Sequence, residues 1–265
     1  EISHSDEWSV RVSFLESYSE AKTTASKFEG MISPLSIAIF QSLFAFHKAN
    51  DVTGDLIEFG VFRGKSASVL LRNLNSGETA YLVDVVGCPD FARPDAISGQ
   101  YEFIKGKGNT FSVSDAFAKS VPASFRLSHH DGSHRFNNVI AEMTFMETRL
   151  APRGIVILDD FLNPAYMQVV AASFNYLATR SSGLEFLPYS NNKAYLCHKE
   201  DFDFYSRFII EKLLSDINSA EFDCMLARSD NHPVYRAFSL YPKNRPGLPD
   251  FYGTDFLGDK YYRLG

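Results

Sequence analysis

Short apolar runs alternate with amphipathic segments through the middle of this chain. Five segments predict strands, most of them strongly apolar, and they lie at residues 56–60, 80–86, 101–105, 124–130 and 155–158. Between the runs, apolar residues recur at every third or fourth position, which is helical spacing, from Ser66, at 113–120 and at 135–150. Strands and helices that alternate over mostly short connections are typical of a parallel, doubly wound sheet.

Beyond the fifth strand the pattern changes. A helix is predicted at 167–179, and two further apolar runs follow at 184–189 and 194–198. The four residues between these runs, from Ser190 to Lys193, predict a turn and therefore an antiparallel hairpin. The sequence thus predicts an α/β fold with a doubly wound, mostly parallel, seven-stranded Rossmann-like sheet and an antiparallel C-terminal hairpin.

Additional segments flank this sheet on both sides. Two helices are predicted before the first strand, at 7–29 and from Pro34 to near Asn50, and we expect them to form a lid. An amphipathic helix is predicted at 202–218, and the Pro-, Gly- and Tyr-rich end from Tyr241 is expected to be an arm with little regular structure. The expected division is a helical cap at 1–52, a Rossmann-like domain at 53–200, and a C-terminal helix and arm at 201–265 in the same globular unit.

The stretch GDLIEFGVFRGKSASVLL, residues 54–71, is the first candidate for a binding site. A strand here breaks at glycine and turns into a helix, so bare backbone N–H groups meet where a nucleotide-like ligand binds. Asp84 ends the next strand, where an acid typically binds the two hydroxyls of a ribose. Phe62 stands where the GxGxxG loop of nicotinamide enzymes has its middle glycine. The alternative is that Gly60 and Gly64 only shape a tight turn.

Three carboxylates follow the next two strands. Asp131 ends the fourth strand, and Asp159 and Asp160 end the fifth. Because neighbouring strands lie about 4.8 Å apart, these acids would converge if the two strands are neighbours. Oxygen ligands suit a hard cation such as Mg²⁺, Mn²⁺ or Ca²⁺. The alternative is that Asp131 forms an Asx turn and Asp160 caps a helix.

Three histidines surround the first of these acids. His129 and His130 are consecutive in a strand and therefore point to opposite faces of the sheet. A histidine near neutral pH can act as a general base, and His134, beyond the turn, is the best candidate. A single histidine is more often structural than catalytic. Met31, in the loop between the leading helices, either touches a ligand or fills the core, and its apolar character alone favours the core.

Composition limits the partners and the compartment. The formal net charge is −6 and no Lys/Arg cluster is present, so no nucleic-acid partner is expected. The three cysteines form no CxxC pair, and no apolar run approaches the roughly eighteen residues that span a bilayer. We expect a cytoplasmic protein without a membrane partner. The apolar leading helices and the aromatic tail suggest a homo-oligomer.

Four motifs in order resemble the class I S-adenosylmethionine-dependent methyltransferases, and more narrowly the macrocin O-methyltransferase group. The motifs are GDLIEFGVFRGKSA at 54–67, Gly30-Met31, HDGSH at 130–134, and GIVILDD at 154–160. Members of that group methylate sugar hydroxyls of natural products. The resemblance covers roughly residues 28–198.

The resemblance implies a role for each matching position. The residues that it places at the S-adenosylmethionine are Met31, Glu58, Gly60, Val61, Phe62, Gly64, Ser66 and Asp84. It implies that Asp131, Asp159 and Asp160 hold Mg²⁺ or another hard divalent cation. The implied reaction is methyl transfer to a hydroxyl of a sugar, glycoside or other small natural-product acceptor, with Asp131 or His134 as the base.

Two other functions compete with this one. An NAD(P)-dependent oxidoreductase would use the segment from Glu58 to Asp84 but would leave Asp131, Asp159 and Asp160 without a role. A non-catalytic binding protein that keeps the fold is the third hypothesis, and the intact acids argue against it. The identity of the acceptor cannot be read from these motifs.

Overall fold

The structure, a computed structural model, describes residues 4–91, 100–107, 121, 124–179, 182–228 and 237–243, with side chains from residue 14 onward. The helix predicted at 113–120 and the chain from residue 244 onward lie outside the described residues. In the described part, one sheet has the strand order β3-β2-β1-β4-β5-β7-β6-β9-β8. The predicted α/β fold with a mostly parallel sheet is confirmed.

Five parallel strands form one half of the sheet. They are β1 (Asp55–Phe59), β2 (Thr79–Asp84), β3 (Gln100–Lys105), β4 (Phe125–His130) and β5 (Leu150–Leu158). The predicted hairpin consists of β6 (Leu184–Ser190) and β7 (Lys193–His198), and β7 pairs antiparallel with β5. The order reverses between β1 and β4, which is the point at which open α/β sheets bind their ligands.

The sheet has nine described strands rather than the seven predicted. β8 (Cys224–Arg228) and β9 (Phe238–Pro242) extend it, because β9 pairs in parallel with β6 and antiparallel with β8. Alternate side chains of these strands are buried, with Leu226, Phe238 and Leu240 each at most 2% exposed. The region expected to hold only a helix and an arm therefore contributes to the core.

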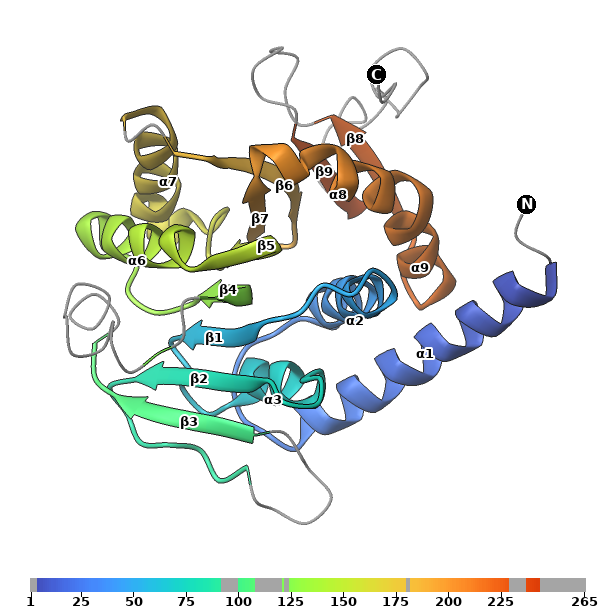
Figure 1. Cartoon of the computed structure of the whole chain (residues 1–265), viewed down its shortest axis with the longest axis horizontal. Helices are drawn as coiled ribbons and strands as arrows, with labels where there is room; N and C mark the ends of the chain where they lie inside the picture. The colour runs from blue at the N-terminus through green and yellow to red at the C-terminus, as the bar shows by residue number, and fades with distance from the viewer. Residues whose placement is uncertain are drawn as a thin grey trace.

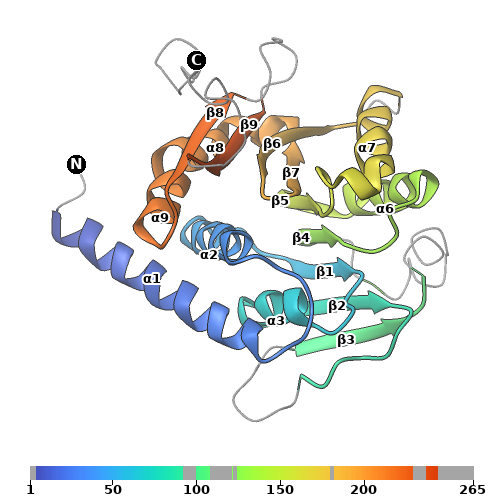
Figure 2. The same ribbon diagram turned by 180° about the vertical axis from the view of Figure 1, so that it is seen from behind.

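Helices cover both faces of the sheet. One layer holds α1 (His4–Ser26), α2 (Pro34–Ala49), α3 (Lys65–Arg72), α8 (Phe202–Phe208), a π-helical turn at Ile209–Leu213 and α9 (Leu214–Ser219). The other holds α6 (Phe136–Thr148) and α7 (Met167–Thr179). Short 3₁₀ turns lie at Pro164–Tyr166 and Lys199–Asp201. Figure 1 shows α6 and α7 on one side of the molecule and α1, α2 and α9 on the other, and Figure 2 shows the same division from behind.

The alternation of side chains explains why the strands read as continuous apolar runs. Ile155 and Ile157 pack into the core with α1 and α2, whereas Val156 and Leu158 pack against α6 and α7. A strand that is buried on both faces needs apolar residues at every position. No helix in the described part of the chain is long and apolar enough to cross a membrane.

The predicted start of α2 is confirmed. The Ser33 hydroxyl oxygen accepts a hydrogen bond of 3.0 Å from the Ser36 N–H, and Pro34 occupies the first turn. Phe40 of this helix is fully buried, with its ring edge-on to the rings of His129 and Tyr195 in the sheet. The helix is thus part of the core on one face of the sheet.

Candidate active site

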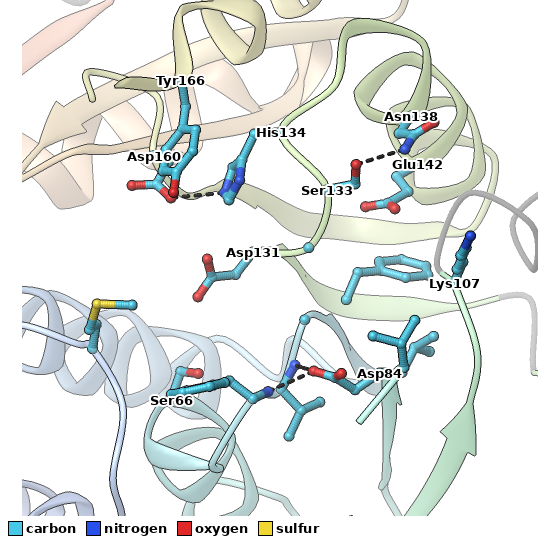
Figure 3. Close-up of a pocket in the computed structure, with 18 of the residues that line it drawn as sticks. Ser66, Asp84, Lys107, Asp131, Ser133, His134, Asn138, Glu142, Asp160 and Tyr166 are labelled. Carbon is cyan, nitrogen blue, oxygen red and sulfur yellow. Dashed lines mark hydrogen bonds and ion pairs between the residues drawn. The ribbon is translucent and has the colours of Figure 1, made fainter. Parts of the chain in front are cut away.

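A cavity of about 680 Å³ opens at the carboxyl ends of β1, β2, β4 and β5 (Figure 3). A ligand of an open parallel sheet binds at this edge, and the volume suits a small molecule. Nine of the predicted site residues line the cavity: Met31, Gly60, Val61, Phe62, Ser66, Asp84, Asp131, His134 and Asp160. Glu58, Gly64 and Asp159 are not among the lining residues.

The loop after β1 keeps the backbone shape that a glycine-rich motif provides. Gly60 and Gly64 both have φ +89°, and a Cβ on Gly64 would lie 2.7 Å from the Phe91 ring. Phe62 has φ +50°, so it adopts a left-handed conformation at the position expected for the middle glycine. Its side chain is 52% exposed and lines the cavity. Phe62 therefore has a left-handed backbone conformation of the kind that glycine adopts readily, and it adds a side chain at this position.

The carboxylate of Asp84 braces this loop. Its Oδ2 accepts hydrogen bonds of 2.7 Å from the N–H groups of Val61 and Phe62, and its Oδ1 accepts one of 2.7 Å from Val86. An ionised carboxylate offers about four acceptor positions, so these bonds leave one position for a ligand. The binding of ribose hydroxyls by Asp84 stays a prediction.

Met31 and Ser66 also line the cavity. Met31 is 84% exposed at the cavity, so it is not the core residue that its apolar character alone predicted. Ser66 lies in the first turn of α3, where unpaired backbone N–H groups face outward. Figure 3 shows Ser66 and Asp84 on the same side of the cavity, opposite His134 and Asp160.

Glu58 is not among the residues that line the cavity. Its side chain is fully buried, and its Oε1 lies 2.8 Å from Nδ1 of His129 on the neighbouring strand. Side chains alternate along β1, so Glu58 points to the same face as Leu56, which α2 covers. Glu58 therefore lies beneath the cavity lining and contacts His129 within the sheet.

The histidines divide as expected. His129 bonds to Glu58, whereas His130 points to the opposite face, where its Nδ1 lies 2.5 Å from Glu142 Oε2. Both rings are fully buried, and His134 is the histidine of the three that lines the cavity. The predicted opposition of His129 and His130 is confirmed by these contacts.

His134 is held between two side chains. Its Nε2 lies 2.8 Å from Asp160 Oδ2, and its ring stacks on Tyr166 with 3.8 Å between centroids and 16° between planes (Figure 3). Burial lowers the pKa of His134, and the charge of Asp160 opposes this shift. The imidazole is therefore neutral near pH 7 and able to accept a proton. Tyr166 was not recognised in the sequence, because its contact with His134 arises only in the folded chain.

The three predicted acids do converge. Burial raises the pKa of Asp131 well above its usual range, and the nearby charge of Asp159 raises it further. Burial acts to raise the pKa of Asp159, but the Lys193 ammonium, the nearby His129 and the Asp160 N–H together outweigh it, and the net pKa is lowered. Asp160 accepts hydrogen bonds from the side-chain amides of Asn163 at 2.9 Å and Asn192 at 2.7 Å.

Lys193 is a site residue that the sequence reading missed. It was assigned to the hairpin turn, but the turn consists of Asn191 and Asn192 alone, with φ +48° and +72°. Asn tolerates this left-handed conformation, and a two-residue loop with both φ positive fits a tight hairpin. Lys193 is therefore the first residue of β7, buried, and ion-paired with Asp159.

The acids and histidines can hold a cation. The ligand atoms of Asp131, His134 and Asp160 lie within 4.8 Å of one another, as do those of His129, Asp131 and Asp159. Within the described part of the chain, the Asp131 carboxylate accepts no hydrogen bond, although it lines the cavity beside two other carboxylates. A poorly satisfied carboxylate among acids fits a hard divalent cation.

A second hollow of about 500 Å³ adjoins the main cavity. The two share Ser133, His134, Arg135 and Tyr166 in their walls. The second hollow continues along the 3₁₀ turn that follows β5 to Met167, whose side chain is 61% exposed. His134 and Tyr166 therefore line two adjoining hollows, one at the sheet edge and one beside the start of α7.

The chain was compared with known proteins. Residues 57–161 match the family model described as a methyltransferase domain. This range includes the loop after β1, Asp84 and the acid cluster. No curated protein sequence matches the chain.

Several solved structures resemble the chain at low identity. The O-methyltransferase NovP is 18% identical with a TM-score of 0.51, over 64% of this chain and 81% of that chain. The mycinamycin-pathway methyltransferase MycE, in complex with Mg and SAH, is 15% identical with a TM-score of 0.49, over 70% of this chain and 54% of that chain. CalS11, a TDP-rhamnose 3'-O-methyltransferase, is 15% identical with a TM-score of 0.45, over 74% of this chain and 95% of that chain. At such identity the NovP likeness shows the fold.

Proposed function

We propose that this chain, which carries a class I S-adenosylmethionine-dependent methyltransferase domain, methylates a hydroxyl of a sugar or another small natural product. The observation that carries the proposal is that one cavity unites the Asp84-braced loop with Asp131, His134 and Asp160. The loop is a binding element for the methyl donor, and the acids and histidine are groups for activating a hydroxyl. NovP, which shares the fold, is an O-methyltransferase.

The walls of the cavity support one orientation of the donor. Asp84 faces the ribose, and the N-terminus of α3 at Ser66 faces the methionine part. The adenine then lies towards Lys107 and Glu142, on the opposite side from Met31. Glu142 is 1% exposed, lines the cavity, and has an Oε1 without a partner among the described residues. An unpaired buried acceptor suits the amino group of adenine.

The second hollow supports a place for the acceptor. An acceptor body beside Tyr166 and Met167 would present a hydroxyl to His134, whose ring borders both spaces. Exposed apolar side chains suit the apolar face of a sugar or of a small natural product. Arg135, exposed at the same wall, adds a hydrogen-bond donor.

Residues of this chain also fit the expected cation. Asp131 and Asp160 face the cavity and would hold Mg²⁺ or another hard divalent ion, with Asp159 behind them. A cation at this place lowers the pKa of an adjoining hydroxyl.

The protein's own groups then move one proton and position one methyl group. Asp160 holds the Nε2 side of the His134 ring, which leaves Nδ1 to accept the proton of the acceptor hydroxyl. Asp131, with its raised pKa, is the second candidate base. The acceptor oxygen forms a bond to the methyl carbon as the carbon–sulfur bond of the sulfonium breaks, and S-adenosylhomocysteine leaves. Fixed geometry between the two substrates supplies much of the rate.

Methyl transfer can be tested directly. The protein is incubated with S-adenosylmethionine and a set of sugars, glycosides and phenols, and the gain of one methyl group is followed by mass spectrometry. Parallel samples contain NAD or NADP in place of the donor. We expect transfer to a hydroxylated acceptor and no redox product. Redox turnover with NAD or NADP, or S-adenosylmethionine binding without transfer to any acceptor, would favour one of the two other functions.

The cation is tested separately with the active acceptor. Chelator is expected to lower the rate for the wild type, and Asp160→Ala and Asp159→Ala are expected to lower it in excess Mg²⁺. Full activity of these variants in chelator would remove the cation from the proposal while leaving methyl transfer intact.

A further inference from the structure

Lys193 places a positive charge inside the acid cluster. Its side chain is buried, with 2% of the residue exposed, at the start of β7. The β5–β7 register pairs Leu158 with Ala194, so Lys193 lies opposite Asp159 across the two strands. The Lys193 Nζ is ion-paired with Asp159 Oδ2 and lies 3.2 Å from His129 Nε2.

Lys193 is also held by a series of hydrogen-bonded side chains that runs through His129 to Glu58. His129 lies between Glu58 and Lys193. The neighbours assign the tautomer: Nδ1–H donates to Glu58 Oε1 at 2.8 Å, and Nε2 accepts from Lys193. Glu58, His129 and Lys193 thus connect three strands beneath the cavity. This network gives the buried Glu58 a role in holding the lysine rather than in binding a ligand.

The same contacts occupy Asp159. Its Oδ1 accepts a hydrogen bond of 2.8 Å from the Asp160 N–H, and its Oδ2 is paired with Lys193. Both oxygens are therefore engaged from inside the protein. Asp160 also has partners, the side chains of Asn163, Asn192 and His134, but none of them is a lysine, and both Asp131 and Asp160 line the cavity. Asp159 is neutralised by the lysine, and the acids available to an incoming cation are Asp131 and Asp160.

We propose that Lys193 is a tethered cation that keeps Asp159 paired and thereby weakens the binding of a divalent cation at Asp131 and Asp160. The proposal rests on the proposed function only in taking this cluster as the cation site. Two physical effects act in the same direction. The fixed ammonium repels a second positive charge in a poorly solvated place, and it competes with that charge for an oxygen of Asp159. The lysine also holds the cluster together in the absence of an ion, because without it the buried Asp159 would lose its counter-charge.

The test is a binding titration of Mn²⁺, followed by calorimetry and by the electron paramagnetic resonance of free Mn²⁺. It compares the full chain with Lys193→Met and with Lys193→Gln, which keeps an N–H donor but removes the charge. Lys212→Met is the matched control, because Lys212 also pairs with a buried carboxylate, Asp216 at 3.0 Å, but lies outside the cavity. Circular dichroism verifies that each variant is folded. If Lys193→Met does not fold, Lys193→Gln carries the comparison.

We expect both Lys193 variants to bind Mn²⁺ about tenfold more tightly than wild type or more, a change of about 1.4 kcal/mol. Lys212→Met should match wild type. The double variant Lys193→Met/Asp159→Asn should lose most of the gain, because the freed ligand is removed. Equal or weaker binding by the Lys193 variants, or no Mn²⁺ binding by any form, would overturn the proposal.

The outcome can be separated from that of the proposed function. S-adenosylhomocysteine is titrated into the same samples, and its affinity should not depend on Lys193, which does not line the cavity. Tighter Mn²⁺ binding without any S-adenosylhomocysteine binding would support the role of Lys193 and reject the methyl-transfer function. The reverse result would reject the role of Lys193 alone.

Discussion

A Cβ atom added to Gly60 would lie 2.0 Å from the backbone carbonyl oxygen of Asp131. The ends of β1 and β4 touch at this point, and the Asp131 N–H donates a hydrogen bond of 2.7 Å to the Phe59 carbonyl. Gly60 belongs to the loop that we propose binds the methyl donor, and Asp131 belongs to the acid cluster. Their contact is what places both halves of the candidate site in one cavity.

The first prediction concerns this contact. Gly60→Ala should lower the free energy of unfolding by roughly 2–5 kcal/mol, because it adds backbone overlap to the strain of a positive φ. Gly77→Ala is the matched control, since Gly77 has φ +85° but no atom within 4 Å of the added Cβ. Gly77→Ala should lower the free energy of unfolding by only about 1–2 kcal/mol. Urea denaturation of both variants measures the difference, and equal costs would show that the close approach does not matter.

The second prediction concerns the orientation of His134. Tyr166→Leu removes the stacked ring and should lower kcat about tenfold, while the Kd of S-adenosylhomocysteine stays near that of wild type. His134→Gln should lower kcat by about a hundredfold or more, the scale of general base catalysis. Phe174→Leu is the control, because Phe174, in α7, is about as exposed as Tyr166 but lies outside both hollows. Single-turnover rates measure the effect, and an unchanged kcat in Tyr166→Leu would argue against a positioning role.

The third prediction concerns a buried ion pair beneath the sheet edge opposite the cavity. Arg126 is 1% exposed and donates to both carboxylate oxygens of Glu78, at 2.8 and 2.6 Å. Glu78→Gln leaves the guanidinium without a counter-charge and should cost about 3–5 kcal/mol of folding free energy.

Two further variants make the test of this pair specific. Glu20→Gln removes the partner of Arg72 in an exposed pair, and it should cost about 1 kcal/mol or less. The double variant Glu78→Gln/Arg126→Met should recover part of the loss, because no charge is then left buried. Chemical denaturation measures all of them, and similar costs for Glu78→Gln and Glu20→Gln would contradict the account.

The fourth prediction is a pH dependence of stability. Burial, followed by the charge of Arg126, lowers the pKa of His47 to about 3, against an unfolded value near 6.5. Below that value the unfolded chain binds a proton that the folded chain does not. His47 therefore contributes stability that is present above pH 6.5 and is lost as the pH falls towards 3.

A variant isolates this contribution. His47→Gln keeps an N–H donor for the Tyr205 hydroxyl, which lies 2.8 Å from His47 Nε2, but does not titrate. The stability difference between wild type and variant should shrink by about 2 kcal/mol when the pH is lowered from 7 to 5. Urea denaturation of both proteins at pH 7 and at pH 5 measures this change in the stability difference. A difference that does not change with pH would mean that His47 is protonated in the folded protein.

The amino-acid pattern predicted the central strands of the parallel half because they are buried on both faces, whereas β3, at the edge of the sheet, is largely exposed. Residues such as Ile155 and Val156 are apolar at consecutive positions, and glycines and acids mark where the strands end. The acids that follow neighbouring strands could then be placed at one edge. These features depend on local chemistry and on general rules of sheet topology.

Other features depended on contacts between distant segments. Lys193 resembled a turn residue until Asn191 and Asn192 were seen to form the whole turn. Glu58 could be placed beneath the cavity only once α2 was known to cover that face of β1. Tyr166 has no sequence signal, because its partner His134 is far away along the chain. β8 and β9 were missed since their pairing with each other and with β6 joins segments far apart in the sequence.

The central claim is that the cavity beside Asp84 binds the methyl donor. Its most direct test is calorimetric titration of S-adenosylhomocysteine and of NAD into wild type, Asp84→Asn and the control Asp51→Asn. Asp51 is exposed and has φ +53°, a conformation that Asn tolerates well. We predict that wild type and Asp51→Asn bind S-adenosylhomocysteine and not NAD, and that Asp84→Asn binds it about tenfold more weakly or worse, a loss of about 1.4 kcal/mol. Binding of NAD in preference to S-adenosylhomocysteine, or equal S-adenosylhomocysteine affinity in Asp84→Asn and wild type, would contradict the claim.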